Sequence, residues 1–256
     1  MTHIARKRFG QNFLHDQSVI SQIIASVHAQ TNEHWVEIGP GQGALTVPLL
    51  KQGLKLEVVE LDRDLVALLQ QKLGHYPNLT IHSADALRFD FASLAAPGEK
   101  LRVIGNLPYN ISTPLMFHLL TNSACFQDMH FMLQREVVER ICAEPGSKDY
   151  GRLSVMMQYY CAPSCLFLVA PESFNPAPKV TSAIVRLIPH QQPPVNVNPV
   201  KLNRIVTEAF AQRRKTLRNS LKKLITEQQI EAVNIDPNCR AETLSLADFA
   251  ALSGYL

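Results

Sequence analysis

Short apolar runs alternate with segments of helical spacing between residues 35 and 134, and this alternation constrains the fold more than any other feature. The runs that predict strands are residues 35–38, 56–60, 79–82, 101–104 and 129–133. The segments between them that predict helices are residues 44–51, 63–73 and 114–120. Strands that alternate with helices in this way indicate a parallel sheet covered by helices on both faces.

The pattern changes after residue 134. Residues 152–160 have helical spacing, whereas residues 165–169 and 183–188 resemble strands and are joined by a proline-rich connection without a helix. Two strands joined in this way should be antiparallel. We therefore expect an α/β fold of the Rossmann-like class I methyltransferase type, with a mostly parallel seven-stranded sheet that ends in an antiparallel hairpin.

A linker is expected after the last strand, because residues 189–199 contain four prolines. The residues that follow it lack strand patterns. The expected domains are an α/β domain at residues 1–190, a linker at 191–199 and a small α-helical domain at 200–256.

Basic residues are concentrated in two places. Residues 1–14 hold three basic and no acidic side chains, and residues 213–223 hold six basic and none acidic. The rest of the chain has 25 − 9 = 16 basic against 22 acidic side chains. Such segregation favours a polyanionic partner, although a basic helix face can also be merely solvated. Residues 213–223 predict an amphipathic helix with Leu217, Leu221 and Leu224 on its apolar side.

Several classes of protein are disfavoured. No apolar run reaches the ~18 residues of a membrane span, and the basic N-terminal residues are not followed by the apolar stretch of a signal peptide. The five cysteines include no CxxC pair. We therefore expect a cytoplasmic protein with reduced thiols, without membrane association and without a bound metal.

A glycine-rich loop follows the first predicted strand, in the sequence EIGPGQG at residues 37–43. Glycines let the backbone approach a ligand, and the helix that follows offers free N–H groups. Glu37 would repel a pyrophosphate but suits a cofactor that carries an ammonium and a sulfonium. Alone, the loop is also compatible with a plain strand–helix turn.

Two further acidic residues lie at the ends of the next two predicted strands: Glu60 is the last residue of the second strand, and Asp85 follows the third. Glu60 can accept hydrogen bonds from two ribose hydroxyls, and Asp85 can accept one from an adenine amino group. Each has a structural alternative: Glu60 as a helix cap, a role Asp62 can also fill, and Asp85 as a turn residue. Because ligands of doubly wound sheets bind at the carboxyl ends of the strands, the set predicts an S-adenosylmethionine pocket.

The tetrapeptide Asn106-Leu107-Pro108-Tyr109 follows the fourth predicted strand. The Asn106 side-chain carbonyl and the Leu107 backbone carbonyl can accept both hydrogens of an exocyclic amine, and Tyr109 can stack on the base. These two hydrogen bonds leave the nitrogen lone pair directed out of the base plane. An ordinary turn between strand and helix is the alternative interpretation.

These motifs resemble those of the small-subunit ribosomal RNA adenine dimethyltransferases. The matching stretches are RKRFGQNFL (6–14), VEIGPG (36–41), ELD (60–62), GNLPYNIS (105–112), FNPAPKV (174–180) and QRRKTLRN (212–219). They extend over nearly the whole chain, and only the glycine loop is shared with methyltransferases at large.

The resemblance implies S-adenosylmethionine-dependent dimethylation, at N6, of two adjacent adenosines in the hairpin loop near the 3′ end of 16S rRNA in the small ribosomal subunit. It also implies the following assignments. Catalytic residues are Asn106, Leu107, Pro108 and Tyr109; cofactor contacts are Asn12, Leu14, Gly39, Glu60, Asp85 and Asn106; RNA contacts are Arg213, Arg214, Lys215 and Arg218. Phe174 is a candidate for the second face of the base, or a core residue. A monomer is expected.

The sequence is compatible with other functions. A 23S rRNA or DNA adenine N6-methyltransferase would use the same chemistry, although the basic C-terminal segment argues against DNA. A nicotinamide oxidoreductase is disfavoured by Glu37 and by the tetrapeptide. A role as a ribosome-assembly factor that binds the immature small subunit is compatible with catalysis.

Overall fold

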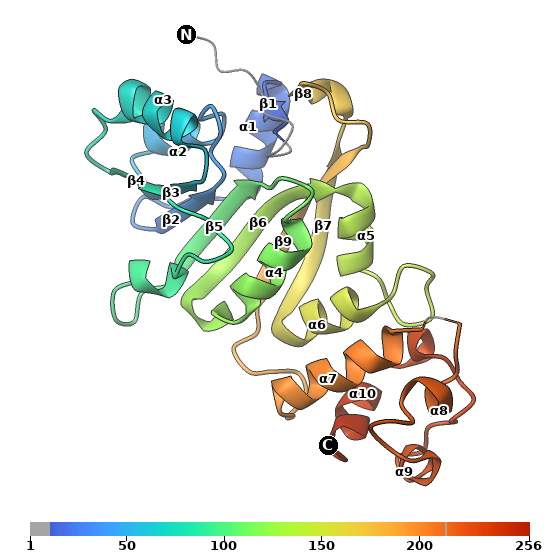
Figure 1. Cartoon of the computed structure of the whole chain (residues 1–256). Coiled ribbons are helices and arrows are strands. Elements are labelled where there is room, and N and C mark those ends of the chain that lie inside the picture. The colour runs from blue at the N-terminus through green and yellow to red at the C-terminus, as the bar shows by residue number, and fades with distance from the viewer. Residues whose placement is uncertain (1–10, 213) are drawn as a thin grey trace. The chain divides into compact units, whose positions relative to one another are not determined.

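The computed structural model describes residues 11–212 and 214–256. The chain forms two compact units, one from Met1–Val138 and Ser164–Pro189 and the other from Glu139–Pro163 and His190–Leu256. The expected domain boundaries placed residues 139–163 with the first unit, and that division stays a prediction. Figure 1 labels the elements.

A seven-stranded sheet organises the first unit. Its strand order is β4-β3-β2-β5-β6-β9-β7. The strands are β2 (His34–Ile38), β3 (Lys55–Glu60), β4 (Leu79–Ser83), β5 (Leu101–Asn106), β6 (Phe126–Gln134), β7 (Cys161–Val169) and β9 (Ser182–Pro189). Every strand that the apolar runs predict is therefore present.

The sheet is parallel from β4 to β6, because the pairs β3–β4, β2–β3, β2–β5 and β5–β6 are all parallel. Strand β9 is antiparallel to β6 and lies between β6 and β7. The two strands expected to form the terminal hairpin, β7 and β9, are therefore neighbours at this edge of the sheet, and the antiparallel direction enters the sheet at the β6–β9 pair. The order reverses at β2, which places the carboxyl ends of β2, β3 and β5 side by side.

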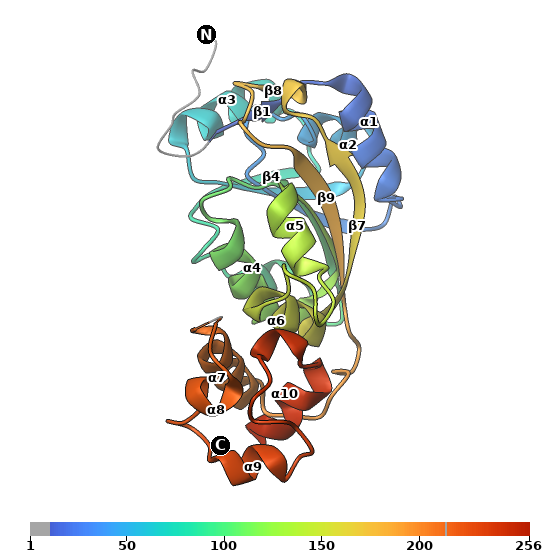
Figure 2. The ribbon, with the colours of Figure 1, turned by 90° about the vertical axis from the view of Figure 1, so that its right-hand side faces the viewer.

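Helices cover both faces of this sheet, with α1 and α4 on opposite faces in Figures 1 and 2. The helices are α1 (Gln17–Ser26), α2 (Thr46–Lys51), α3 (Arg63–Leu73), α4 (Ser112–Leu120) and α5 (Arg135–Ile141). Helix α3 begins after Asp62, whose side chain accepts a hydrogen bond from the backbone N–H of Asp64 as the predicted cap. Helices α1 and α5 have no counterpart among the predicted elements.

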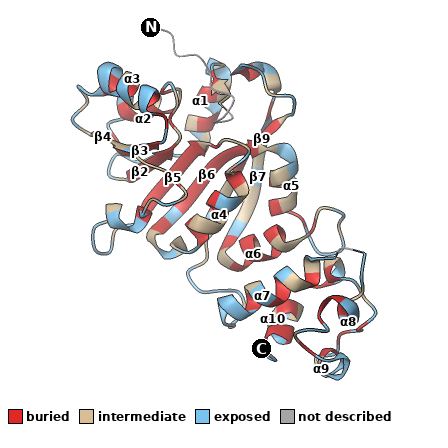
Figure 3. Ribbon diagram, viewed as in Figure 1, coloured by how far each residue is buried: buried red, intermediate tan, exposed pale blue. Residues whose placement is uncertain are grey.

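One layer of the core of the first unit lies between the sheet and helices α1, α2 and α3. Trp35, Leu56 and Val58 from the strands pack there against Ile23 of α1 and Leu49 of α2. The central strands β5 and β6 are buried along most of their length, as Figure 3 shows. Burial on both faces explains why residues 103–104 of β5 and 131–133 of β6 are consecutive apolar residues with no alternation.

The second unit is helical. It contains α6 (Arg152–Tyr160), α7 (Pro199–Phe210), α8 (Leu217–Ser220), α9 (Glu227–Glu231) and α10 (Leu246–Ser253). Residues 190–198 before α7 form neither helix nor strand. Among the described residues, no helix has the length and apolar character needed to cross a bilayer.

The amphipathic helix predicted for residues 213–223 is wrong, because only the four-residue helix α8 forms there. Leu217 and Leu221 are buried as expected. However, the backbone N–H groups of Leu217 and Arg218 donate to the carbonyls of Cys239 and Pro237, at 2.9 and 3.0 Å. A distant segment therefore satisfies the donors that helical spacing would assign to preceding residues.

Candidate active site

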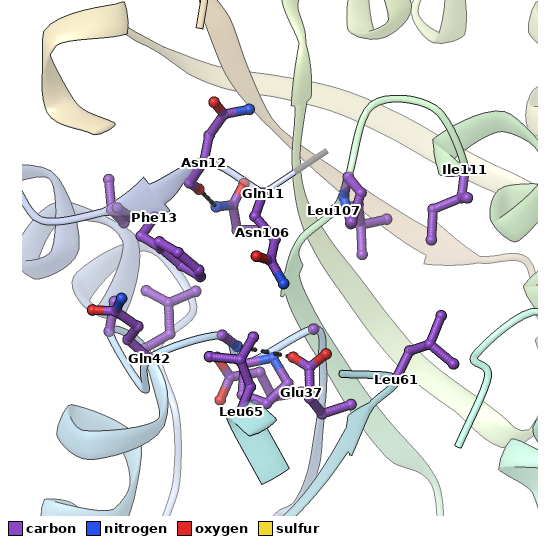
Figure 4. Close-up of a pocket in the computed structure, with 18 of the residues that line it drawn as sticks. Gln11, Asn12, Phe13, Glu37, Gln42, Leu61, Leu65, Asn106, Leu107 and Ile111 are labelled. Atoms are coloured by element: carbon purple, nitrogen blue, oxygen red, sulfur yellow. Dashed lines mark hydrogen bonds between the residues drawn. The ribbon is translucent and has the colours of Figure 1, made fainter. Parts of the chain in front are cut away.

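A cavity of about 350 Å³ opens at the carboxyl ends of β2, β3 and β5. Its lining includes Asn12, Leu14, Glu37, Gly39, Glu60 and all four residues of the Asn106–Tyr109 tetrapeptide. In the view of Figure 4, Asn12, Asn106 and Leu107 occupy the upper part and Glu37, Leu61 and Leu65 the lower part. Residues at the ends of three strands thus meet at one site, as the position of their motifs predicts, and the N-terminal segment joins them there.

The glycine loop lets the N-terminal segment approach the cavity closely. Gly39 and Gly41 have φ values of +67° and +57°, a backbone conformation that is strained for residues with a side chain. A Cβ at Gly41 would lie 3.2 Å from two ring atoms of Phe13. Glycine is therefore required at this position both for its backbone conformation and for the contact with Phe13.

Glu60 ends β3 and is only 7% exposed. Its Oε1 accepts a hydrogen bond from the backbone N–H of Asp62 at 2.9 Å, and its Oε2 accepts one from that of Gly41 at 3.2 Å. Burial raises the pKa of this carboxyl group, while these two hydrogen bonds oppose the shift. The bonds hold the carboxylate at the cavity wall, and each oxygen keeps a lone pair for a ligand.

Glu37 is more deeply buried, with 2% exposure, and accepts a hydrogen bond from the hydroxyl of Thr46 at 2.6 Å. Burial raises the pKa of Glu37 to about 8, the hydrogen bond from Thr46 lowers it, and the charge of Glu60 raises it further. The group therefore holds a proton near neutral pH while no cation is close. A ligand with positive charge would favour its ionised form.

Asp85 follows β4 and its Oδ1 accepts a hydrogen bond from the backbone N–H of Leu87 at 3.0 Å. Among the described residues that line the cavity, Asp85 is not included. This geometry is that of the turn residue, the structural alternative for Asp85. Its predicted contact with an adenine amino group stays a prediction.

The tetrapeptide begins within the sheet, because Asn106 is the last residue of β5. Leu107 is buried and its N–H donates to the carbonyl of Met132 in β6 at 3.2 Å. The hydroxyl group of Tyr109 lies 2.7 Å from that of Ser182 at the start of β9. Burial raises the pKa of Tyr109, and the hydrogen bond with Ser182 opposes this shift.

The N-terminal segment reaches the cavity through a two-stranded sheet that the sequence does not indicate. Strand β1 (Phe13–Leu14) pairs antiparallel with β8 (Phe174–Asn175). Asn12, just before β1, accepts a hydrogen bond at its carbonyl from the side-chain nitrogen of Asn106 at 3.0 Å. Strands of two residues carry no periodic signal, so only the family resemblance places Asn12 and Leu14 here.

Phe174 lies opposite Leu14 in this pair and is 3% exposed. It belongs to the core cluster that contains Trp35 and Leu56. The structure thus places Phe174 in the core, which was one of its two candidate roles.

The basic segment of the second unit is exposed. Arg214, Lys215 and Arg218 are accessible to solvent, and Nη1 of Arg218 lies 3.6 Å from a carboxylate oxygen of Glu227. Arg213 lies outside the described residues, as do the N-terminal basic residues Arg6, Lys7 and Arg8. An exposed ion pair at this distance stabilises the protein little and leaves Arg218 available for another anion.

The sequence is similar to those of known ribosomal RNA methyltransferases. Residues 2–256 match the model of a family described as ribosomal RNA adenine dimethylase. A Pseudomonas aeruginosa protein named ribosomal RNA small subunit methyltransferase A is 58% identical over 255 residues, which cover 99% of this chain and 95% of that protein.

Solved structures confirm the predicted fold class. A dimethyladenosine transferase from Plasmodium falciparum has a TM-score of 0.77 and 27% identity, covering 93% of this chain and 95% of that one. The 23S rRNA methyltransferase ErmE has a TM-score of 0.74 at 24% identity, covering 96% and 99%, and this likeness concerns the fold alone.

Proposed function

The chain belongs to the ribosomal RNA adenine dimethylase family, and on this basis we propose that it dimethylates N6 of two adjacent adenosines in the hairpin loop near the 3′ end of 16S rRNA. The methyl donor is S-adenosylmethionine. The observation that carries this proposal is the convergence of Glu37, Glu60 and Asn106 on one cavity.

The cavity fits the methyl donor by the chemistry of its lining. Glu60 presents a carboxylate whose orientation is held by two backbone N–H groups, as recognition of a ribose diol requires. Glu37 provides a carboxyl group that ionises next to a cation. Gly39 exposes backbone at the wall, and Asn12 and Leu14 also line the cavity. When bound, S-adenosylmethionine supplies a methyl group activated by its sulfonium.

The tetrapeptide binds and orients the nucleophile. The Asn106 Oδ1 and the Leu107 carbonyl accept the two N–H groups of the adenine amine, and the Tyr109 ring stacks on the base. These contacts direct the nitrogen lone pair at the methyl carbon. Orientation of this kind can lower a barrier by ~7–11 kcal/mol, and the product nitrogen loses its proton to solvent without a dedicated base. The target base must leave its stack, which costs a few kcal/mol.

The exposed residues Arg214, Lys215 and Arg218, together with Arg213, contact phosphates of the RNA. Such contacts position a nucleic acid without reading its bases. Binding to the immature small subunit would also make the protein a ribosome-assembly factor. We expect it to act as a monomer in the cytoplasm.

The proposal is tested by incubating the protein and labelled S-adenosylmethionine with small ribosomal subunits from cells that lack it. Mapping of the labelled nucleosides should find N6,N6-dimethyladenosine at two adjacent positions near the 3′ end of 16S rRNA. Large subunits and duplex DNA serve as parallel substrates. Label confined to 23S rRNA or to DNA would favour the same chemistry on another substrate, and absence of label from every substrate would contradict the proposal.

A further inference from the structure

A hydrogen bond joins the proposed base-binding tyrosine to the first residue of strand β9. The hydroxyl oxygens of Tyr109 and Ser182 are 2.7 Å apart, although 73 residues separate them in the chain. Ser182 is fully buried and pairs with Gln134 of β6, so its position is set by the interior of the sheet. Tyr109 is half-buried and lines the cavity.

We propose that Ser182 is a positioning residue that holds the ring of Tyr109 at the angle needed to stack on the target adenine, and that the second methyl transfer depends on it more than the first. This inference rests on the function proposed above.

Hydrogen bonds restrain Tyr109 both at its backbone and at the tip of its side chain. The carbonyl of Tyr109 accepts a hydrogen bond from the Ser112 hydroxyl at 3.1 Å, which fixes the backbone at the start of α4. The phenolic oxygen, at the far end of the side chain, contacts Ser182. Restraint of the backbone and of the tip restrains χ1 of Tyr109. Rotation about χ2 leaves the phenolic oxygen in place, but a phenol hydroxyl forms its hydrogen bonds close to the plane of its ring, so the bond to Ser182 also favours one ring plane.

The second transfer depends more strongly on the orientation of the Tyr109 ring, because its substrate has fewer N–H groups to hold it. Unmethylated adenine offers two N–H groups to the Asn106 Oδ1 and the Leu107 carbonyl. In each transfer the nitrogen lone pair forms the new bond to carbon, the carbon–sulfur bond breaks with its electrons left on sulfur, and the nitrogen loses one proton. N6-methyladenine therefore offers one N–H group, and stacking on Tyr109 provides a larger share of its positioning.

The test uses Ser182→Ala, Tyr109→Phe and the double variant, with small subunits that lack the modification as substrate. Single-turnover experiments at saturating methyl donor resolve the rates of the first and second transfers. In both single variants we expect the second rate to fall about fivefold or more, as expected when a positioning hydrogen bond is removed, and the first rate to fall less. N6-methyladenosine should accumulate, while the affinity for S-adenosylmethionine should change less than about twofold, because neither hydroxyl group belongs to the donor's proposed contacts.

The double variant should be no worse than the worse single variant, because both changes remove the same hydrogen bond. Ser182→Thr keeps the hydroxyl group and should restore the second rate. The matched control is Ser253→Ala, which removes a buried hydroxyl bonded to the Ala250 carbonyl in α10. Its ratio of monomethyl to dimethyl product should equal that of the unmodified protein.

Three results would overturn the inference: an unchanged product ratio in Ser182→Ala, an unchanged ratio in Tyr109→Phe, or additive losses in the double variant. If Ser182→Ala does not fold, Tyr109→Phe breaks the same bond from the accessible side and decides the question. Failure of the proposed function is a separate result, since the unmodified protein would then form no dimethyladenosine.

Discussion

The side-chain nitrogen of Asn106 donates a hydrogen bond to the backbone carbonyl of Asn12 at 3.0 Å. An asparagine amide has one donor end and one acceptor end, and only the acceptor end can receive an N–H group of adenine. Because the Asn12 carbonyl takes the donor end, Oδ1 is left for the base. The N-terminal segment thus determines which way the Asn106 amide faces.

Asn106→Ala should nearly abolish methyl transfer and leave RNA binding largely intact. The side chain orients the amine in the transition state, and removal of one such interaction commonly costs about 10²–10³ in rate. Some weakening of S-adenosylmethionine binding is also expected, because Asn106 lines the cavity. The measurement is single-turnover transfer of a labelled methyl group to unmodified small subunits, with Asn122→Ala as the control. Dimethylation by Asn106→Ala at the unmodified protein's rate would refute the role of the tetrapeptide.

Glu60→Ala should weaken the binding of S-adenosylmethionine by roughly tenfold or more. The change leaves two ribose hydroxyls without their acceptor, and hydrogen bonds to charged groups contribute ~1.5–3 kcal/mol. Titration calorimetry measures the affinity, with the exposed Glu231→Ala as the control. Unaltered affinity in a folded Glu60→Ala protein would remove Glu60 from the binding site.

The affinity for S-adenosylmethionine should rise as the pH increases toward about 8. Glu37 has a pKa of about 8 in the unliganded protein, and a nearby cation stabilises its ionised form. Binding near neutral pH should therefore release a proton, which calorimetry in buffers of different ionisation enthalpy detects. Glu37→Gln should remove this proton release. Equal proton release by the variant would show that another group titrates.

The raised pKa of Glu37 also predicts how the free energy of unfolding depends on pH. Its pKa is raised in the folded protein above the unfolded value, so its contribution favours folding below the unfolded pKa and is lost as the pH rises through about 8. Without ligand, Glu37→Gln should therefore gain thermal stability relative to the unmodified protein above this pKa more than in mildly acidic buffer. A pH-independent difference in midpoint temperature would contradict this assignment.

Replacement of Arg214, Lys215 and Arg218 by Ala should weaken RNA binding and flatten its salt dependence. The slope of log affinity against log salt should decrease by ~0.7–0.9 for each phosphate that the protein no longer neutralises. The control removes the same charge from the exposed residues Lys51, Lys72 and Arg88 of the first unit. Equal effects of the two triple variants would mean that the basic segment acts only through net charge.

Local patterns in the chain predict the seven strands of the large sheet and helices α2, α3, α4 and α6, but not α1 or α5. The strand predicted at residues 56–60 appears as Lys55–Glu60, and the helix predicted at residues 63–73 appears as Arg63–Leu73. Buried strands need continuous apolar residues and helices need apolar residues at a period of about 3.6, so both are visible in a short window of sequence. The same patterns locate the glycine loop, which lies at the end of β2, and Glu60, which is the last residue of β3.

Local sequence patterns do not predict contacts between segments that are distant in the chain. The pairing of Phe13 and Leu14 with Asn175 and Phe174, and the bond between Tyr109 and Ser182, depend on how the whole sheet is connected. The same limit explains the wrong helix prediction at residues 213–223. The spacing of the leucines fits a helix, but the backbone N–H groups of Leu217 and Arg218 donate to the carbonyls of residues 239 and 237. Side-chain spacing records which residues are buried, but backbone N–H groups bond to whichever carbonyl the tertiary structure brings within reach.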